Sequence, residues 1–479
     1  MRQQISLIAL LFLIGGCVSY HPQPLLPGKT ADSVESRKLD DPGLRLFFAL
    51  HGRNPNHWPK RTWDLADLTL VALYESPDLY VQRTYMDLSV AGIATAGQRP
   101  NPSLSFFTAL NSIVIAPEET SPWALGMMFD LPFETAGKRG IRIREARNLS
   151  GAARFRLGQT AWNVRSRVRR SFLSYVHSIR QTQNLEEEVT VRARILRLWQ
   201  QRYLLGEASA IKEDSARIDL ERARLSLNAA HEQEAVARVA LAQATGLPEK
   251  ALVSVRISYS DLEEAPSADL LPAPSVQRAA LINRLDIREA LAGYAASEEA
   301  LKLEIANQYP NISLGPGGYS FVQGDNMWAL GFSVPLPILN QNQGPIAEAR
   351  ARRTQAYELF TSLQFRVIGQ IESSLAHYRG ALKSFDTTRS LLARQKAYQR
   401  MMGRRFAEGE VDRLALLDSQ LVLVATKSDH LTALMKTQQT LESLEDAVQV
   451  PLVGSSGRVH DSSARKDIKR SPFHDPRSK

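Results

Sequence analysis

Cysteine and aromatic residues are scarce in this chain of 479 residues, which has one cysteine and only 7% Phe, Trp and Tyr. So few aromatic rings are unusual for a large compact core but normal for long helices packed by Leu, Ala and Val. A chain otherwise free of cysteine suits an oxidising exterior compartment, where stray thiols are a liability. The remaining composition, with 44% hydrophobic and 23% charged residues, excludes a disordered chain.

Recognisable catalytic and metal-binding patterns are also missing. The nine histidines and eight methionines lack the spacing of metal ligands. Gly137-Lys138 resembles part of a phosphate-binding loop, but Pro132 stands where the earlier glycine is required. No nucleophile–base pair is recognisable, and the arginines behind the net charge of +9 alternate with acids along predicted helices. We therefore expect neither an enzyme nor a cofactor, a metal site or a nucleic-acid partner.

The first 17 residues have the layout of a signal peptide. Arg2 precedes an apolar run from Ile5 to Ile14, which is too short for a transmembrane helix. The run ends in Gly15-Gly16-Cys17, which resembles a bacterial lipoprotein signal whose cysteine becomes the acylated first residue. Val18 after that cysteine resembles signals sorted to the outer membrane. We predict Cys17 as the lipid-attachment residue; the alternative is a chance cysteine in a discarded leader.

Two segments of strict alternation, 123–133 and 328–338, predict strands. Each has large apolar residues on one face and mainly small or polar residues on the other, and is long enough to cross a bilayer as a β-strand. A half-buried strand of a soluble sandwich is the alternative. Each segment follows a partner that starts with Pro-Asn, so we predict strands at about 100–116, 122–134, 308–322 and 327–339. Trp123 and Trp328 are the expected membrane-interface aromatics.

Long helices with a seven-residue repeat follow each pair of strands. The first runs from about Ile141 to Leu204 with apolar residues at heptad positions, which predicts a coiled coil about 90 Å long. Each long helix ends at a glycine, Gly206 or Gly409, and a second long helix returns. These glycines lie 203 residues apart, as do Pro248 and Pro451. The gapless repeat indicates that geometry fixes the helix length.

The chain is therefore predicted to consist of two repeats and their connections. Its predicted parts are a signal peptide at 1–17, an extended N-terminal segment at 18–62, a first repeat at 63–248, a linker at 249–274, a second repeat at 275–451 and a disordered basic tail at 452–479.

Four strands cannot close a barrel, and an open edge in lipid leaves unpaired amides. Two copies would supply eight strands, which side chains fill, whereas three would supply twelve and leave a passage.

From Cys17 to about Pro451 the chain resembles the TolC family of outer-membrane efflux channels. The resemblance is carried by the duplicated layout, the Pro-Asn-x-Ser-Leu strand starts, Asp78 and Asp286 early in equivalent helices, and the glycine-turned hairpins. Residues 134–139 are similar to the CzcC-like branch, linked to heavy-metal efflux, and the lipid-anchored start resembles the OprM and CusC branches. This implies a mainly α fold with four strands per chain, forming a trimeric twelve-stranded β-barrel continued by a long α-helical barrel.

The same resemblance implies a function and its partners. The chain would be the outer-membrane channel of a tripartite efflux system, lipid-anchored and extending into the periplasm. It would form a homotrimer in contact with outer-membrane lipid and bind a periplasmic adaptor and an inner-membrane pump of the resistance-nodulation-division type. Adaptor contacts would lie at the hairpin tips, namely Tyr203, Gly206, Glu207, Phe406, Gly409 and Glu410.

The resemblance also implies a gate. In the family two aspartates three residues apart ring the closed periplasmic entrance; here the second matches Asp418, while Ala415 replaces the first. One ring of three carboxylates would bind cations more weakly than two rings; alternatively, Asp418 is an ordinary polar residue on a helix face. Two other functions stay open: an exit duct for secreted polypeptides of the type I system, or a lipid-anchored coiled-coil scaffold without a pore.

Overall fold

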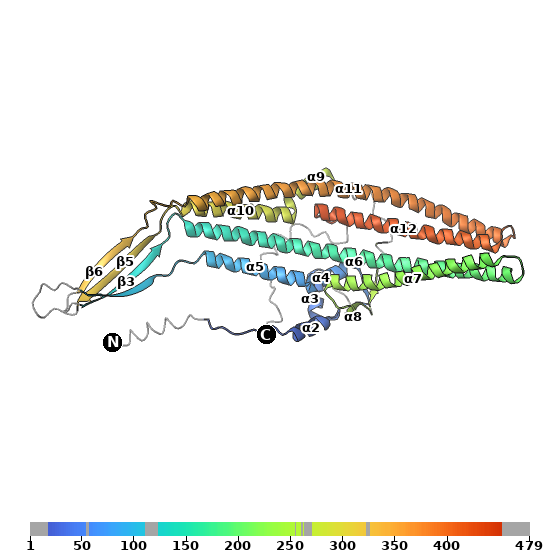
Figure 1. The fold of residues 1–479 in the computed structure, drawn as a ribbon, viewed down its shortest axis with the longest axis horizontal. Coiled ribbons are helices and arrows are strands. Elements are labelled where there is room, and N and C mark those ends of the chain that lie inside the picture. Colours follow the sequence, from blue (N-terminus) through green and yellow to red (C-terminus); the bar gives the residue numbers. More distant parts are fainter. Residues whose placement is uncertain are drawn as a thin grey trace, which may run out of the picture.

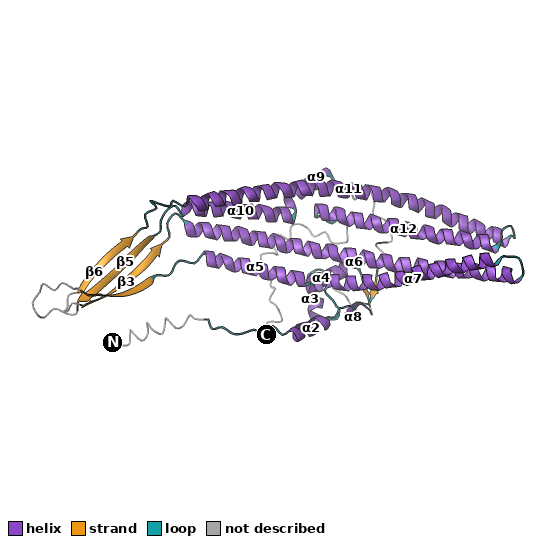
Figure 2. Ribbon diagram, in the orientation of Figure 1, coloured by secondary structure: helices purple, strands orange, loops and turns teal. Residues whose placement is uncertain are grey.

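The computed structural model shows an elongated molecule with a small sheet at one end and two helical hairpins pointing to the other (Figure 1). It describes residues 18–53, 57–110, 123–253, 255–259, 262, 271–321 and 326–452. Cys17 and the chain beyond 452 lie outside these residues. The mainly helical, duplicated fold predicted from the sequence is confirmed (Figure 2).

Helices make up most of the described chain, and each repeat contains two shorter ones followed by two long ones. The first repeat contains α4 (Leu65–Glu75), α5 (Pro77–Ala96), α6 (Lys138–Leu204) and α7 (Ala210–Thr245). The second contains α9 (Pro274–Asn283), α10 (Leu285–Ala306), α11 (Gln343–Ala407) and α12 (Arg413–Val448). No helix of the described residues is both long enough and apolar enough to span a bilayer.

The long helices form one layer because their heptad positions bury apolar side chains. Val168 and Phe172 of α6 are fully buried, and so are Val367 and Tyr378 of α11. Helix α6 packs against α7 and α12, and α12 packs against α11, so the order across the layer is α7, α6, α12, α11 (Figure 1). Nearer the sheet, α5 and α10 flank α6, and α10 also contacts α11. The layer therefore has two outer edges, α5 with α7 on one side, where α4 and α8 also contact α7, and α11 on the other, where α9 also contacts it.

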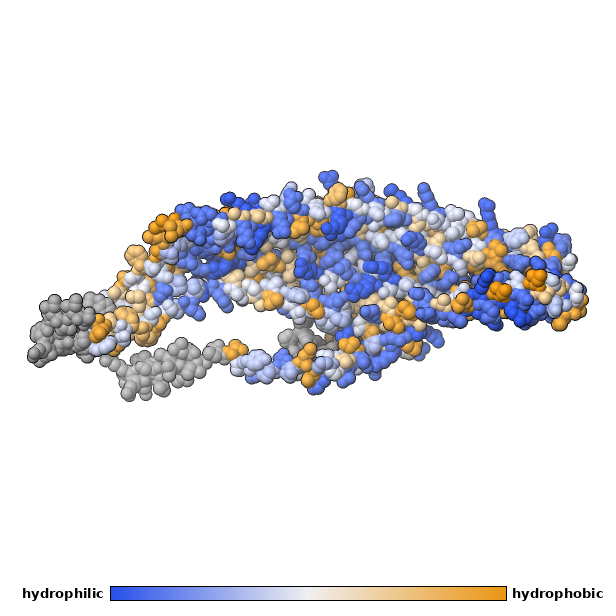
Figure 3. Space-filling model, viewed as in Figure 1, coloured by the Kyte–Doolittle hydropathy of each residue, from blue (hydrophilic) through white to orange (hydrophobic). Residues whose placement is uncertain are grey.

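The sheet is antiparallel with strand order β2-β3-β5-β6. Its strands are β2 (Ser103–Leu110), β3 (Trp123–Phe133), β5 (Ile312–Phe321) and β6 (Asn326–Ser333). In the observed register Phe129 pairs with Leu104, and Leu131 pairs with Leu314, which pairs with Phe332. Because directly paired residues share a face, most of the large apolar residues of the four strands lie on one side, with Phe107 and Met128 on the other. Figure 3 shows hydrophobic residues gathered at this end of the molecule.

The end of the last strand differs from the prediction. Strand β6 ends at Ser333 instead of about 339, because Pro335 and Pro337 have no N–H to donate to a ladder. The predicted ends of the first and third strands, at about 116 and 322, fall within 111–122 and 322–325, which lie outside the described residues. The apolar residues after β6 form an exposed segment in which Leu339 is 98% accessible.

The predicted extended N-terminal segment is wrong, because residues 18–62 contain two helices, α2 (Pro27–Glu35) and α3 (Pro42–Leu50). Both begin at a proline, which is favoured at the first helical position. Leu44 and Phe48 of α3 are buried in the main core. The Arg37 guanidinium donates hydrogen bonds to the carbonyl oxygens of Glu75 and Gly246, at 3.0 and 2.8 Å. This segment is thus part of the packed helical body.

The stretch between the repeats is also more structured than a plain linker. It begins with helix α8 (Lys250–Val253), and strand β4 (Arg256–Ile257) pairs in parallel with β1 (Thr62–Trp63). The second repeat then begins with helices α9 and α10, although Asp286 lies early in what the sequence presents as one helical stretch. Instead α9 and α10 are separated at Arg284, whose extended backbone and buried guanidinium mark the break.

Candidate functional site at the hairpin tips

The two hairpin tips have the same construction. Gly206 and Gly409 take left-handed φ values of +76° and +78°, which a residue with a side chain rarely adopts. In both turns the next residue closes the helix end, with the Glu207 N–H bonding the Arg202 carbonyl at 2.8 Å and the Glu410 N–H bonding the Arg405 carbonyl at 2.9 Å. A glycine at this position therefore sets the point where each hairpin reverses.

The tips expose apolar side chains beside carboxylates. Leu204 and Leu205 are 83% and 73% accessible, and Tyr203 and Phe406 are 45% and 38% accessible. Glu207 and Glu410 are exposed next to them. This mixture of apolar and acidic groups suits a contact surface, and every residue predicted at the tips lies on it.

An ion pair that no local sequence pattern predicts joins the two tips. Arg202 Nη2 of α6 lies 2.9 Å from Asp412 Oδ2 at the start of α12. Asp412 is also the N-cap of α12, where its other carboxyl oxygen accepts the Ala415 N–H at 2.8 Å. The N-cap role of Asp412 can be predicted from the sequence. Its ion-pair partner Arg202 lies 210 positions away, and no local sequence pattern predicts that pairing.

The pKa values of Asp418 and Asp412 are shifted in opposite directions. Accepting hydrogen bonds from the Ala415 N–H and from Arg202 lowers the pKa of Asp412. Partial desolvation raises the pKa of Asp418, and the nearby charge of Asp412 raises it further. Its neighbour Leu417 is buried with Leu414 and Leu421 against α6, while Asp418 itself is exposed. The Asp418 carboxylate is thus directed away from the packed seam.

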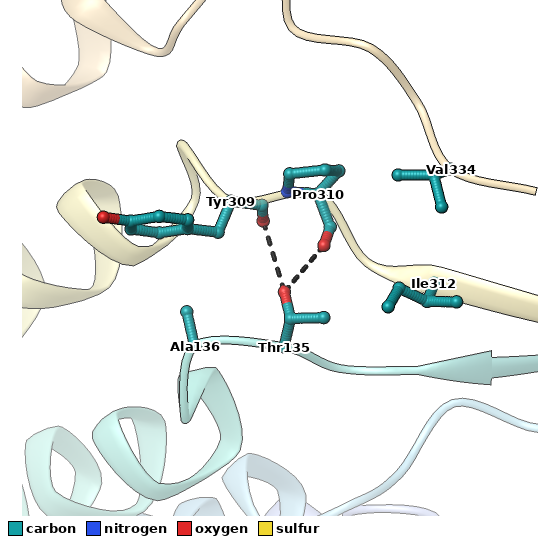
Figure 4. Close-up of a pocket in the computed structure, with 6 residues that line it drawn as sticks. All are labelled: Thr135, Ala136, Tyr309, Pro310, Ile312 and Val334. Carbon is teal, nitrogen blue, oxygen red and sulfur yellow. Dashed lines mark hydrogen bonds between the residues drawn. The ribbon is translucent and has the colours of Figure 1, made fainter.

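A second constellation lies where the strands meet the helices. An open apolar hollow there is lined by Thr135, Ala136, Tyr309, Pro310, Ile312 and Val334 (Figure 4). The Thr135 hydroxyl donates to the Pro310 carbonyl at 2.7 Å, and the buried Lys138 ammonium donates to the Tyr309 carbonyl and to Asn311 Oδ1. These bonds fasten the end of β3 to the start of β5, so the hollow is held between the two repeats.

A buried ionic cluster joins α6 to α12 midway along the layer. Glu445 is fully buried between Arg165 and Arg169, at 2.9 and 2.6 Å. Burial raises the pKa of Glu445, but the charges of the two arginines outweigh it and lower that pKa overall. Burial raises the pKa of Glu442 to about 7, because the single pairing with Arg170 does not compensate for desolvation.

The two tryptophans predicted at the membrane interface, Trp123 and Trp328, lie away from these groups. Trp123 begins β3, whereas Trp328 pairs with Gly318, which in turn pairs with Met127, so the two tryptophans are not neighbours. Both are exposed, at 52% and 83%. Among the described residues no group of three or more His, Cys, Asp or Glu side chains is placed to hold a metal ion.

Comparison with known proteins identifies the fold. A family model described as outer membrane efflux protein matches residues 69–247 and 276–448, which are most of both repeats. The chain is similar to the cobalt-zinc-cadmium resistance protein CzcC of Cupriavidus metallidurans, with 24% identity over 75% of this chain and 84% of that protein. Two solved structures are similar in fold. A membrane protein from Pseudomonas aeruginosa has a TM-score of 0.67 and 18% identity, covering 80% of this chain and 92% of that one. CusC, described as forming a transmembrane channel, has a TM-score of 0.66 and 18% identity, covering 90% of this chain and 99% of CusC.

Proposed function

The chain belongs to the outer membrane efflux protein family, and from this premise we propose that it is the outer-membrane channel of a tripartite efflux system. In this proposal three copies form a duct from the periplasm to the outside, anchored in the outer membrane by lipid on Cys17. A periplasmic adaptor and an inner-membrane pump, of the resistance-nodulation-division type, deliver the cargo. The family is one of channels rather than enzymes.

The observation that carries the proposal is a four-stranded sheet with one apolar face and two unpaired edges, continuous with a long helical layer. At about 1.5 Å per residue, the 67 residues of α6 extend about 100 Å beyond the sheet. Unpaired backbone groups at β2 and β6 cost several kcal/mol each in lipid, so the sheet is stable there only when other copies cover both edges. Three copies supply twelve strands, enough to close around a passage.

The tips are the ends that reach farthest from the sheet, which favours them as the adaptor contact (Figure 1). Three copies would also bring three Asp418 side chains around one axis. Like charges held close together repel, so cations bound between the three carboxylates would stabilise a closed entrance. The Arg202–Asp412 pair would hold each copy in the closed arrangement.

For the cargo we propose metal cations, because the similar protein CzcC is named for resistance to cobalt, zinc and cadmium. The test uses a host that lacks its own channel but expresses a cognate pump and adaptor. We expect this chain to restore growth in Co²⁺, Zn²⁺ or Cd²⁺ and the purified protein to conduct ions in planar bilayers.

The matched control is Phe332→Arg, which places a charge on the apolar face of β6 and should abolish both activities. Restored resistance to a dye or drug but not to metals would reassign the cargo. Export of a polypeptide with a type I system would reassign the partner. Absence of both conductance and resistance would refute the channel.

A further inference from the structure

The hollow between the two repeats lies on the apolar side of the sheet. Phe133 pairs with Ile312 at the ends of β3 and β5, on the face that carries most of the large apolar residues. Thr135 lies two positions after Phe133, and Val334 lies two positions after Phe332, so the alternation of the strands places both on that same face. The lining residues Thr135, Ile312 and Val334 therefore continue the face that the proposed channel turns towards lipid.

The hollow has the size and the walls of a site for an apolar chain. Its volume is about 510 Å³, within the range of about 300–1,000 Å³ for ligand pockets. Thr135 and Ala136 lie across from Pro310 and Val334 (Figure 4). Because the Thr135 hydroxyl already donates to the Pro310 carbonyl, the lining offers mainly carbon atoms to an occupant.

Beside the hollow is a buried ammonium without a carboxylate at contact distance. Lys138 is 6% exposed, and its Nζ donates to the carbonyl of the lining residue Tyr309 at 2.6 Å and to Asn311 Oδ1 at 2.7 Å. Both acceptors are neutral. The Glu134 carboxylate acts on Lys138 from farther away and is bound by Arg142, with an Nη2–Oε2 distance of 3.0 Å. Burial lowers the pKa of Lys138 despite this attraction. A buried positive charge of this kind is costly unless an anion pairs with it.

An exposed guanidinium comes next in the chain. Arg139 uses its Nε–H on a backbone carbonyl at 2.6 Å, and its other N–H groups have no acceptor within the part of the chain that the structure describes. The start of α11 lacks such a pair of cations. Its N-cap Asn342 is left-handed like Gly137, with φ values of +63° and +68°, but Gln343 and Gly344 follow it. The two adjacent cations are thus particular to the start of α6.

We propose that this hollow binds an anionic phospholipid of the surrounding membrane, with an acyl chain against Ile312 and Val334 and the phosphate on Lys138 and Arg139. The apolar wall continues the lipid-facing side of the sheet, and Lys and Arg form strong, charge-assisted hydrogen bonds to phosphate. Basic pockets of membrane proteins bind lipid head groups in this way. The inference rests on the proposed channel, which places the hollow where the strands leave the bilayer.

The charge of the head group decides which lipid is preferred. A phosphatidylcholine head group carries its own cation, which Lys138 and Arg139 repel, whereas phosphatidylglycerol carries only the phosphate charge. One basic residue near an anionic lipid strengthens binding about five-fold. Both lipids offer the same acyl chains to the hollow, so a preference between them reports on the two cations.

The first test is native mass spectrometry of the purified protein in detergent with added phosphatidylglycerol or phosphatidylcholine. The wild-type protein should retain one phosphatidylglycerol per chain and less phosphatidylcholine. Lys138→Gln, which can still donate to the Tyr309 carbonyl, and Arg139→Gln should each weaken binding of phosphatidylglycerol about five-fold. Arg350→Gln removes an exposed cation of α11 and is the matched control. Equal retention of both lipids by the wild type, or an equal loss in the control, would overturn the proposal.

The second test concerns the acyl chain. Val334→Trp fills the hollow and should reduce retention of both lipids, whereas Leu336→Trp, at a side chain that is 74% exposed outside the lining, should not. A phosphatidylglycerol with a photoreactive acyl chain should label residues 309–312 and 334–336. Labelling confined to other parts of the sheet would contradict the site. Retention by Cys17→Ala but not by acylated wild type would assign the hollow to the chain's own lipid and also overturn the proposal.

Ion conductance in bilayers of phosphatidylcholine alone separates this inference from the channel. Protein that conducts ions but shows no preference for phosphatidylglycerol would refute the lipid site and keep the channel. Protein that retains phosphatidylglycerol through Lys138 and Arg139 but never conducts would refute the channel and keep the site.

Discussion

Arg202 at the end of one hairpin lies 2.9 Å from Asp412, the residue that caps the returning helix of the other hairpin. The contact links the two repeats at the end of the molecule that lies farthest from the sheet (Figure 1). It therefore helps to hold the two tips together within one copy.

Breaking this link should favour an open entrance. Arg202→Ala removes an ion pair whose partners are 30% and 50% exposed, and such pairs contribute about 0.2–1 kcal/mol. We expect a higher open probability in planar bilayers. Arg217→Ala, which removes a pair with Glu213 inside α7, is the control and should leave gating unchanged. Equal effects of the two changes would contradict the role of the link.

The gate prediction concerns Asp418. Asp418→Ala should reduce cation selectivity and cation block without dissociating the trimer. Because the pKa of Asp418 is raised, wild-type selectivity should already decline at a pH above the usual range for aspartate as the carboxylate is protonated. The Arg202–Asp412 link should persist at that pH, since the pKa of Asp412 is lowered. If Asp412 or Glu410 substitutions abolish selectivity and Asp418→Ala does not, the gate lies nearer the tip.

Glu442 should make stability depend on pH near neutrality. Its pKa is raised to about 7 in the folded chain, so folding is favoured most below the unfolded value of 4.5 and loses free energy as pH rises from there through 7. Glu442→Gln should therefore raise the melting temperature at pH 8 and have little effect at pH 4. Glu445→Gln is the comparison and should destabilise by about 3–5 kcal/mol at pH 8, because it leaves Arg165 and Arg169 without their carboxylate.

The two faces of the sheet should differ in their tolerance of charge. Met127→Arg or Phe332→Arg places a cation on the apolar face and should cost about 2–4 kcal/mol at mid-depth in a bilayer, and less at Phe332, which lies beside the end of β6. Ser333→Arg and Gly331→Arg, on the other face, should still assemble into heat-stable trimers. Gly126 is unsuitable as a control, because a Cβ there would lie 2.3 Å from the Phe107 ring. Equal loss of trimer on both faces would show that these are not membrane strands.

Acylation of Cys17 is testable directly. Intact mass analysis of the membrane-extracted protein should show a chain beginning at Cys17 with a diacylglycerol and a third acyl chain. The expectation comes from the apolar run that ends in Gly15-Gly16. An unmodified chain that begins at Val18 or later would contradict it.

Repetition made most of this fold predictable. Alternation located the strands, heptads located the long helices, and the glycines located both tips. The N-terminal helices were missed because their prolines suggested extended chain, although Pro27 and Pro42 sit where helices begin. Contacts between distant residues, such as Phe107 across from Gly126 and Arg202 with Asp412, depend on strand register and helix placement. No local pattern in the sequence encodes either one.

The equal lengths of the two returning helices limit how the proposed channel can change in length. Both returning helices contain 36 residues, and the two tip glycines occupy equivalent positions. One residue inserted into one helix would turn every later side chain by about 100° and misplace the seam. A viable extension must therefore add whole heptads, about 10.5 Å each, to all four long helices at once. If the proposed channel spans the periplasm, its reach would accordingly change only in steps.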